Sequence, residues 1–172
     1  AYYRGRAARE RVLACPRVSP PKAELRDDIP LPIDDSDEGC DTPETEPETV
    51  WRHQHFGIPI DDEHDVISDS GVEIYSYLQA KDVDQVLIMG VHTNMCVLHR
   101  YFGIKQWVGW GVPVALVRDL TDAMYNPARP PYVSHAAGTE LVIGYIERFW
   151  CPTITSQDLL VAGSDRNGEM TA

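Results

Sequence analysis

Two largely apolar runs, residues 85–89 and 112–117, constrain the fold of this chain more than any other feature. Runs of this kind, rich in valine, leucine and isoleucine, are typical of strands that are covered on both faces of a parallel sheet. Shorter β-type runs lie at residues 65–68 and 152–155. Segments with helical periodicity separate the four runs. This alternation predicts an α/β fold, with a doubly wound parallel sheet, right-handed crossovers and helices on both faces.

The connecting segments carry apolar side chains at helical spacing, which predicts three helices with one buried face each. Residues 69–71 supply N-capping chemistry for the first helix, and Thr93 or Asn94 can cap the second. The expected buried side chains are Val72, Ile74, Tyr75 and Leu78, then Val97, Leu98, Tyr101 and Phe102, then Leu141, Val142, Tyr145, Ile146, Phe149 and Trp150. Residues 7–13 are good helix formers and predict a further short helix that ends before Pro16.

One stretch, residues 14–49, differs from the rest in composition. It holds more than half of the 13 prolines and most of the acidic excess. Proline fixes φ and lacks an amide donor, and crowded carboxylates repel one another, so we expect a long irregular insertion there. The remaining pattern predicts a single domain over residues 1–162, followed by a polar tail at 163–172.

The charge balance and the cysteine spacing exclude several classes of protein. With 27 acidic and 15 basic residues the net charge is −12, which argues against nucleic acid as a partner. No run approaches the roughly 18 apolar residues that a membrane span needs. The four cysteines lie far apart, without a Cys-x-x-Cys pair, which predicts neither a zinc site nor a disulfide scaffold. The opening residues carry no apolar targeting segment, so a reducing, cytoplasmic compartment is expected.

Ligands of doubly wound sheets bind beyond the carboxyl ends of the strands, which directs attention to residues 90–96 and 119–125. The first segment links an apolar strand to an expected helix and places Cys96 near the amino end of that helix. A thiol there loses its proton more easily, and free backbone N–H groups can bind the oxyanion formed in acyl transfer. The alternative is that Cys96 is inert packing, as most free cysteines are. Cys15, Cys40 and Cys151 are interpreted as structural.

Further polar residues near these edges are candidates for the pocket: Asn94, Asp119, Thr121, Tyr125 and Asn126. Asp119 can alternatively cap the turn that follows its strand. The acidic run at 34–41 lacks the spacing of a calcium loop and is interpreted as a solvated loop. His53, His55 and His64 do not share a helix face, so we expect no metal site. Gly90 has no Gly-x-Gly-x-x-Gly partners, so no dinucleotide cofactor is expected.

The sequence around Cys96 is Gly-Val-His-Thr-Asn-Met-Cys-Val, residues 90–97. It resembles the Gly-[Val/Ile]-x-Thr-[Asp/Asn]-x-Cys-Val signature of the isochorismatase-like cysteine hydrolases. Residues 117–122 are similar to the strand of that family that continues into Arg-Asp-x-Thr. The likeness covers roughly residues 65–160 and extends through His135 to the strand at 153–155.

This resemblance implies a six-stranded doubly wound sheet and an Asp–Lys–Cys triad in which Cys96 is the nucleophile. It also implies a cis peptide bond between Val91 and His92. The backbone N–H groups of His92 and Cys96 would then form the oxyanion hole, and the side chain of His92 can line the pocket. The implied reaction is hydrolysis of a C–N bond in a small amide or ureido compound through a thioester.

The chain departs from the family pattern at two members of the triad. No strand that ends in Asp precedes residues 7–13, so we expect the chain to begin after the first two strands of the fold. Residues 68–70, Ser-Asp-Ser, occupy the place of the family lysine. Arg52 can supply a cation to the pocket instead, or remain a solvated loop residue, and a histidine from residues 53–55 can serve as base.

These departures leave two alternatives open. The chain can be a non-catalytic relative that serves as a small-molecule binding or assembly domain. It can also be a fragment that does not fold alone, because a missing central strand leaves unpaired edges. The apolar helix expected over 141–150 suits either the core or the contact between two copies of the chain.

Overall fold

The computed structural model describes residues 5–23, 25, 29–37 and 54–161. The chain forms two compact units. Unit 1 comprises Ala1–Lys22 and Thr42–Asp84, and unit 2 comprises Ala23–Asp41 and Gln85–Ala172. The described residues of the stretch 14–37 form no helix or strand.

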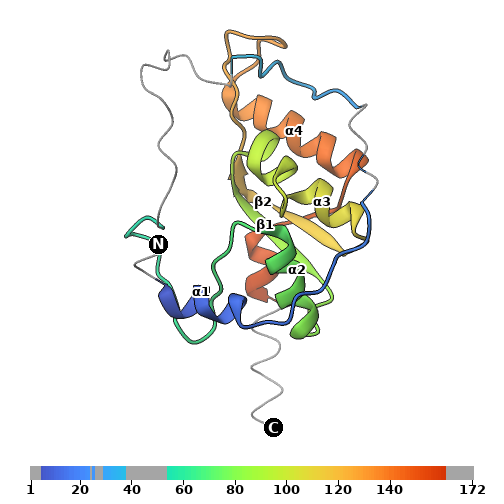
Figure 1. Cartoon of the computed structure of the whole chain (residues 1–172). Helices are drawn as coiled ribbons and strands as arrows, with labels where there is room; N and C mark the ends of the chain where they lie inside the picture. The colour runs from blue at the N-terminus through green and yellow to red at the C-terminus, as the bar shows by residue number, and fades with distance from the viewer. Residues whose placement is uncertain (1–4, 24, 26–28, 38–53, 162–172) are drawn as a thin grey trace. The chain divides into compact units, whose positions relative to one another are not determined.

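Unit 1 contains two helices that contact each other, α1 at Arg6–Leu13 and α2 at Gly71–Ala80 (Figure 1). Both were predicted, and the hydroxyl of Ser70 caps α2 by accepting the Glu73 N–H at 3.4 Å. The predicted strand at residues 65–68 is wrong. The Ile67 N–H donates to the carbonyl of Ala8 at 3.4 Å and its side chain is buried, so this segment packs on α1 as an irregular chain.

The buried face of α2 is more polar than its periodicity predicts. Glu73 is only 6% exposed, whereas Val72, expected in the core, is 40% exposed. Arg9 of α1 donates two hydrogen bonds to the Glu73 carboxylate, and Arg17 donates a third at 2.6 Å. The bonds from Arg9, with further ones from Ser68 and Arg17, lower the pKa of Glu73 to about 2 despite its burial. An ionic cluster therefore joins α1 and residue 17 to α2.

Unit 2 contains a parallel three-stranded sheet in the order β1-β2-β3, which confirms the predicted α/β character. The strands are β1 at Val86–Val91, β2 at Val114–Asp122 and β3 at Thr153–Ile154. A π-helical turn, η1 at Thr93–Val97, follows β1, then α3 at Ile104–Gly109 and α4 at His135–Phe149. Both α3 and α4 contact β2 (Figure 1).

Burial is concentrated on β2. Residues 114–117 are buried, as their apolar run predicts, whereas the residues of β1 alternate between half-buried and exposed. The prediction that the run at 85–89 is covered on both faces is therefore wrong. The exposed side chains are the alternate residues Leu87, Met89 and Val91, so one whole face of β1 is exposed, and β1 pairs with β2 alone among the described strands. The largest fully buried side chains in unit 2 are Leu98, Ile104, Trp107, Leu116, Val117, Tyr125, Val142, Ile143 and Ile146.

The helix expected after β1 is shorter than predicted. Val97 and Leu98 are buried as expected, but the helical turns end at His99 and Tyr101 is 76% exposed. A Cβ at Gly103 would lie 2.9 Å from both the Arg100 nitrogen and the Val97 oxygen. The chain therefore turns back closely on itself at Gly103, and a separate helix, α3, begins at the next residue.

Two glycines of α4 provide a matched test of this packing. A Cβ at Gly138 would lie 2.2 Å from the ring of Tyr125, whereas a Cβ at Gly144 would meet nothing within 4 Å. We expect Gly138→Ala to lower the free energy of unfolding by about 1–3 kcal/mol through overpacking. Gly144→Ala should raise it by up to about 1 kcal/mol, because alanine favours the helix. Urea unfolding of both variants tests this; equal effects would contradict the packing of Tyr125 on α4.

Candidate active site

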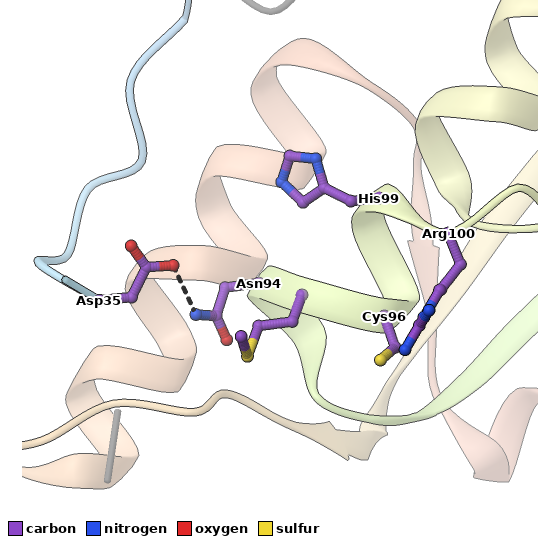
Figure 2. Close-up of a pocket in the computed structure, with 6 residues that line it drawn as sticks. Asp35, Asn94, Cys96, His99 and Arg100 are labelled. Carbon is purple, nitrogen blue, oxygen red and sulfur yellow. Dashed lines mark hydrogen bonds between the residues drawn. The ribbon is translucent and has the colours of Figure 1, made fainter. Parts of the chain in front are cut away.

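Cys96 lines a pocket of about 370 Å³ in unit 2, just beyond the carboxyl end of β1 (Figure 2). Its lining residues are Asp35, Asn94, Met95, Cys96, His99 and Arg100. The Cys96 side chain is half-buried, so its sulfur belongs to the pocket wall and not to the core. Of the predicted site residues, the structure brings Cys96 and Asn94 together in this pocket.

The other described cysteines lie elsewhere. Cys15, Cys96 and Cys151 carry free thiols. Cys151 is buried after α4, and burial raises the pKa of its thiol to about 11. The Cys15 thiol follows α1 in unit 1 and lies 3.6 Å from the Arg11 carbonyl oxygen. Cys40 is outside the described residues.

A tight turn connects β1 to η1. Gly90 has φ +120°, a conformation that favours glycine, and the peptide bond between Val91 and His92 is cis, as the resemblance implies. His92 is extended, and its carbonyl accepts the N–H groups of Met95 and Val97, each at 3.1 Å. It therefore takes the N-cap position that the sequence assigned to Thr93 or Asn94. Because η1 has five residues, the macrodipole expected beside Cys96 is not developed.

Thr121 of β2 is hydrogen-bonded to this turn and holds it against the neighbouring strand. Its hydroxyl donates to the Gly90 carbonyl at 2.8 Å and lies 2.7 Å from the Thr93 hydroxyl. The strand register explains the contact, because Gly90 lies opposite Thr121 in the β1–β2 pair. Thr121 does not line the pocket and instead positions the turn that carries Cys96.

Asn94 fixes the opposite wall of the pocket. It is 1% exposed, and its amide nitrogen donates to Asp35 and to the Met124 carbonyl, each at 3.1 Å. Its amide oxygen accepts the Met124 N–H at 2.8 Å. This pocket residue was predicted, and its amide both shapes the wall and holds Asp35 in it.

Hydrogen bonds hold the acidic segment that contains Asp35 to the rest of unit 2, so the solvated-loop interpretation is wrong for its described part. The Asp34 N–H donates to the Pro130 carbonyl at 2.9 Å. Asp37 accepts hydrogen bonds from Asn126 at 2.9 Å and Arg129 at 3.1 Å. The carboxylates of Asp35 and Asp37 thus accept hydrogen bonds from side chains far along the chain, and Arg129 also neutralises the charge of Asp37.

Substitution of Asn94 tests this wall. We expect Asn94→Ala to cost about 2 kcal/mol of unfolding free energy, because it leaves the partly buried N–H and carbonyl groups of Met124 without their partners. Asn126→Ala is the matched control, since Asn126 also binds the acidic segment but is less buried, and it should cost about 1 kcal/mol or less. Urea unfolding measures both; a smaller effect at Asn94 would contradict its assigned role.

Asp119 and Tyr125 lie away from the Cys96 pocket, contrary to the sequence prediction. Asp119 is within β2, which runs on to Asp122, and it accepts the N–H of Ser156 at 2.8 Å and the Ser156 hydroxyl. Those bonds lower the pKa of Asp119. Tyr125 is 2% exposed, and its hydroxyl donates to the Arg129 carbonyl at 2.8 Å. Both residues support the fold, and Asp119 binds Ser156 far along the chain instead of capping the turn after its own strand.

His135, at the start of α4, is held by both ring nitrogens. Nδ1 lies 2.9 Å from the Tyr125 carbonyl oxygen, and Nε2 lies 3.0 Å from Asp122 Oδ1. The Tyr125 carbonyl, followed by the Asp122 carboxylate, raises the pKa of His135 against the effect of burial. Burial alone would raise the pKa of Asp122, but hydrogen bonds from Thr139 and His135 lower it. The pair therefore stabilises the loop between β2 and α4.

The remaining predicted candidates do not form a site in the described part of the chain. Arg52 and His53 lie outside the described residues. The His64 ring nitrogen lies 2.8 Å from Asp61 on an exposed turn. Within residues 5–23, 25, 29–37 and 54–161, no three His, Cys, Asp or Glu side chains are placed to hold a metal ion. None of the helices in the same ranges is long and apolar enough to span a bilayer.

Sequence reasoning missed four residues of the pocket: Asp35, Met95, His99 and Arg100. Spacing could have found two of them, because residues three and four positions after Cys96 fall on its side of a helical turn. The Arg100 N–H donates to the Cys96 carbonyl at 3.2 Å, which is the contact of such a turn. Asp35 could not be found in this way, since it reaches Asn94 from an irregular segment 59 residues away.

Comparisons of the chain with protein-family models, with curated proteins and with solved structures found no match. No family is therefore assigned, and the resemblance around Cys96 remains an expectation.

Proposed function

We propose that the protein is a cysteine hydrolase of the isochorismatase-like type that cleaves a C–N bond in a small amide or ureido compound. The observation that carries the proposal is the position of Cys96 in a pocket at the carboxyl edge of a parallel sheet. Ligands of parallel α/β sheets bind at this edge. The sequence resemblance at residues 90–97 and 117–122 supports the same assignment.

In the proposed reaction the Cys96 sulfur attacks the substrate carbonyl carbon, and the carbonyl π electrons move to oxygen. The N–H groups of His92 and Cys96 bind the resulting oxyanion. The C–N bond then breaks, the leaving nitrogen takes the proton that the thiol has given up, and a thioester remains. Water attacks the thioester, releases the carboxylic or carbamic acid, and restores the thiol. The net reaction consumes one water.

The stability of the turn around Cys96 favours this chemistry. Thr121 and Thr93 fasten the turn to β2, and Asn94 is buried with its amide fully engaged. A nucleophile on such a supported turn keeps its position relative to a bound carbonyl, which is what catalysis by proximity requires.

Interception of the thioester tests the proposal. The protein is incubated with a panel of primary carboxamides and N-carbamoyl compounds, and ammonia release is followed with and without hydroxylamine. We expect at least one member to release ammonia and, with hydroxylamine, to yield a hydroxamate from a carboxamide or an N-hydroxyurea from an N-carbamoyl compound. Ammonia release without either trapped product would contradict a covalent route through Cys96.

A second candidate function is binding without catalysis. The observation that favours it is the absence of lysine at residues 68–70. In the structure the Ser68 hydroxyl donates a hydrogen bond to the Glu73 carboxylate, and the Ser70 hydroxyl caps α2 by accepting the Glu73 N–H. In that case panel members would bind, as measured by calorimetry, and none would be turned over.

A further inference from the structure

The carboxylate of Asp35 lines the Cys96 pocket, and its charge is not paired within the described part of the chain. Its Oδ2 accepts a hydrogen bond from the Asn94 amide at 3.1 Å, and that amide is neutral. Among the described residues, no arginine, lysine or histidine pairs with Asp35. The nearby Asp37, in contrast, pairs with Arg129 at 3.1 Å. The negative charge of Asp35 is therefore available to a ligand in the pocket.

The basic side chains of the pocket differ from Asp35 in this respect. Figure 2 shows Asp35 with Asn94 at one end of the pocket, and Cys96 with Arg100 at the other. His99 and Arg100 each already have an interaction partner in the protein. Asp35 keeps one carboxylate oxygen, Oδ1, that accepts no hydrogen bond from any residue the structure describes. A ligand therefore meets an acceptor with a full negative charge at the end of the pocket away from the sulfur.

The protein holds Asp35 in this position from several directions. The Asp34 N–H donates to a backbone carbonyl of the loop between β2 and α4, and Asp37 pairs with Arg129 of the same loop. Asn94, which binds the Asp35 carboxylate itself, is only 1% exposed. A charged group that is fixed before a ligand arrives binds it with little loss of conformational entropy. The carboxylate is thus preorganised for an interaction that the chain itself does not make.

We propose that Asp35 determines the substrate class of the pocket by pairing with a cationic nitrogen of the substrate, a protonated amine or a quaternary ammonium. The assignment rests on the proposed hydrolase function, whose reacting atom is the Cys96 sulfur. A volume of about 370 Å³ suits a small molecule, and the net charge of −12 attracts cations to the chain. The substrate is therefore an amide or ureido compound with one positive charge at the end away from its C–N bond.

Two thiol reagents that differ in charge test the proposal without a known substrate. They are 2-(trimethylammonium)ethyl methanethiosulfonate, which is cationic, and 2-hydroxyethyl methanethiosulfonate, which is uncharged. With either reagent the thiol gives up its proton, its sulfur attacks the sulfenyl sulfur to form a disulfide, and methanesulfinate leaves. The protein is treated with an excess of both reagents in equal amounts, and mass spectrometry of the Cys96 peptide gives the ratio of cationic to uncharged product.

We expect this ratio at Cys96 to fall about fivefold in Asp35→Asn, the size expected for one contact of opposite charges in water. The variant keeps the shape of the side chain and an oxygen that can accept the Asn94 amide, and circular dichroism confirms its fold. Asp34→Asn is the matched control, because it removes a carboxylate from the same segment but outside the pocket lining. The control should leave the ratio unchanged.

The outcomes separate this proposal from the function on which it rests. An unchanged ratio in Asp35→Asn overturns the cation assignment, and so does an equal slowing of both reagents, since Asp35 would then act on the thiol alone. An equal fall of the ratio in Asp34→Asn also overturns it, because the field of the whole segment would be responsible. If the uncharged reagent modifies Cys96 no faster than Cys15, the proposed nucleophile fails, whereas a fivefold fall in Asp35→Asn would still assign the cation site.

Discussion

Replacing Cys96 with alanine is expected to abolish hydrolysis, lowering kcat for any amide that the wild-type chain turns over by at least about a thousandfold. Removal of a covalent nucleophile has effects of this size or larger, because the acyl intermediate can no longer form. Cys96 is half-buried on a pocket wall, so its replacement should change stability little. The measurement is ammonia release at saturating substrate, with far-UV circular dichroism to confirm the fold.

Cys15→Ala is the matched control for this substitution. Cys15 is also half-buried with a free thiol, but it lies in unit 1 and outside the Cys96 pocket. The control should retain wild-type kcat. Activity that survives in Cys96→Ala, or is lost equally in both variants, would rule out Cys96 as the nucleophile.

Replacing Glu73 with alanine is expected to lower the free energy of unfolding of unit 1 by about 3 kcal/mol. The variant leaves Arg9 and Arg17 without the carboxylate that they share, and breaking a largely buried ion pair costs this much. The pKa of Glu73, lowered from 4.5 to about 2, corresponds to a similar free energy. Hydrogen exchange of the amides in α1 and α2 measures the change.

The same cluster gives a pH dependence with a defined sign. Because the folded pKa of Glu73 is lowered, its stabilisation is fully present above about pH 4.5 and is lost as the pH falls toward 2. Glu10→Ala is the control, since Glu10 also pairs with an arginine of α1 but both partners are exposed, and it should cost less than about 0.5 kcal/mol. Equal effects of the two variants would contradict the role of burial.

The sequence pattern predicted much of the fold, because several of its helices and strands are determined by interactions between residues close in sequence. The capping Ser70, the buried run of β2 and the helix that ends before Pro16 depend on neighbours in the sequence, and all are present in the structure. The exposed edge of β1 and the break at Gly103 depend on which strands pair and on how closely two turns approach. Periodicity carries no information on either.

The candidate site divides in the same way. Cys96 and Asn94 could be predicted from their place after an apolar strand, and both line the pocket. Asp119 could not be assigned correctly from the sequence. Its partner Ser156 follows β3, and only the pairing of β3 with β2, which the sequence does not reveal, brings the two residues together. Asp35 was missed for the same reason, since a buried asparagine 59 residues away selects it from a run of similar acids.

The rate at which iodoacetamide modifies Cys96 at pH 7 tests the nucleophile most directly. Peptide mapping by mass spectrometry compares it with the rates at Cys15, half-buried in unit 1, and at Cys151, whose buried thiol has its pKa raised to about 11. We expect Cys96 to react at least about tenfold faster than Cys15, as activated thiols do, with Cys151 slowest. Modification of Cys96 at or below the rate of Cys15 would contradict the hydrolase proposal.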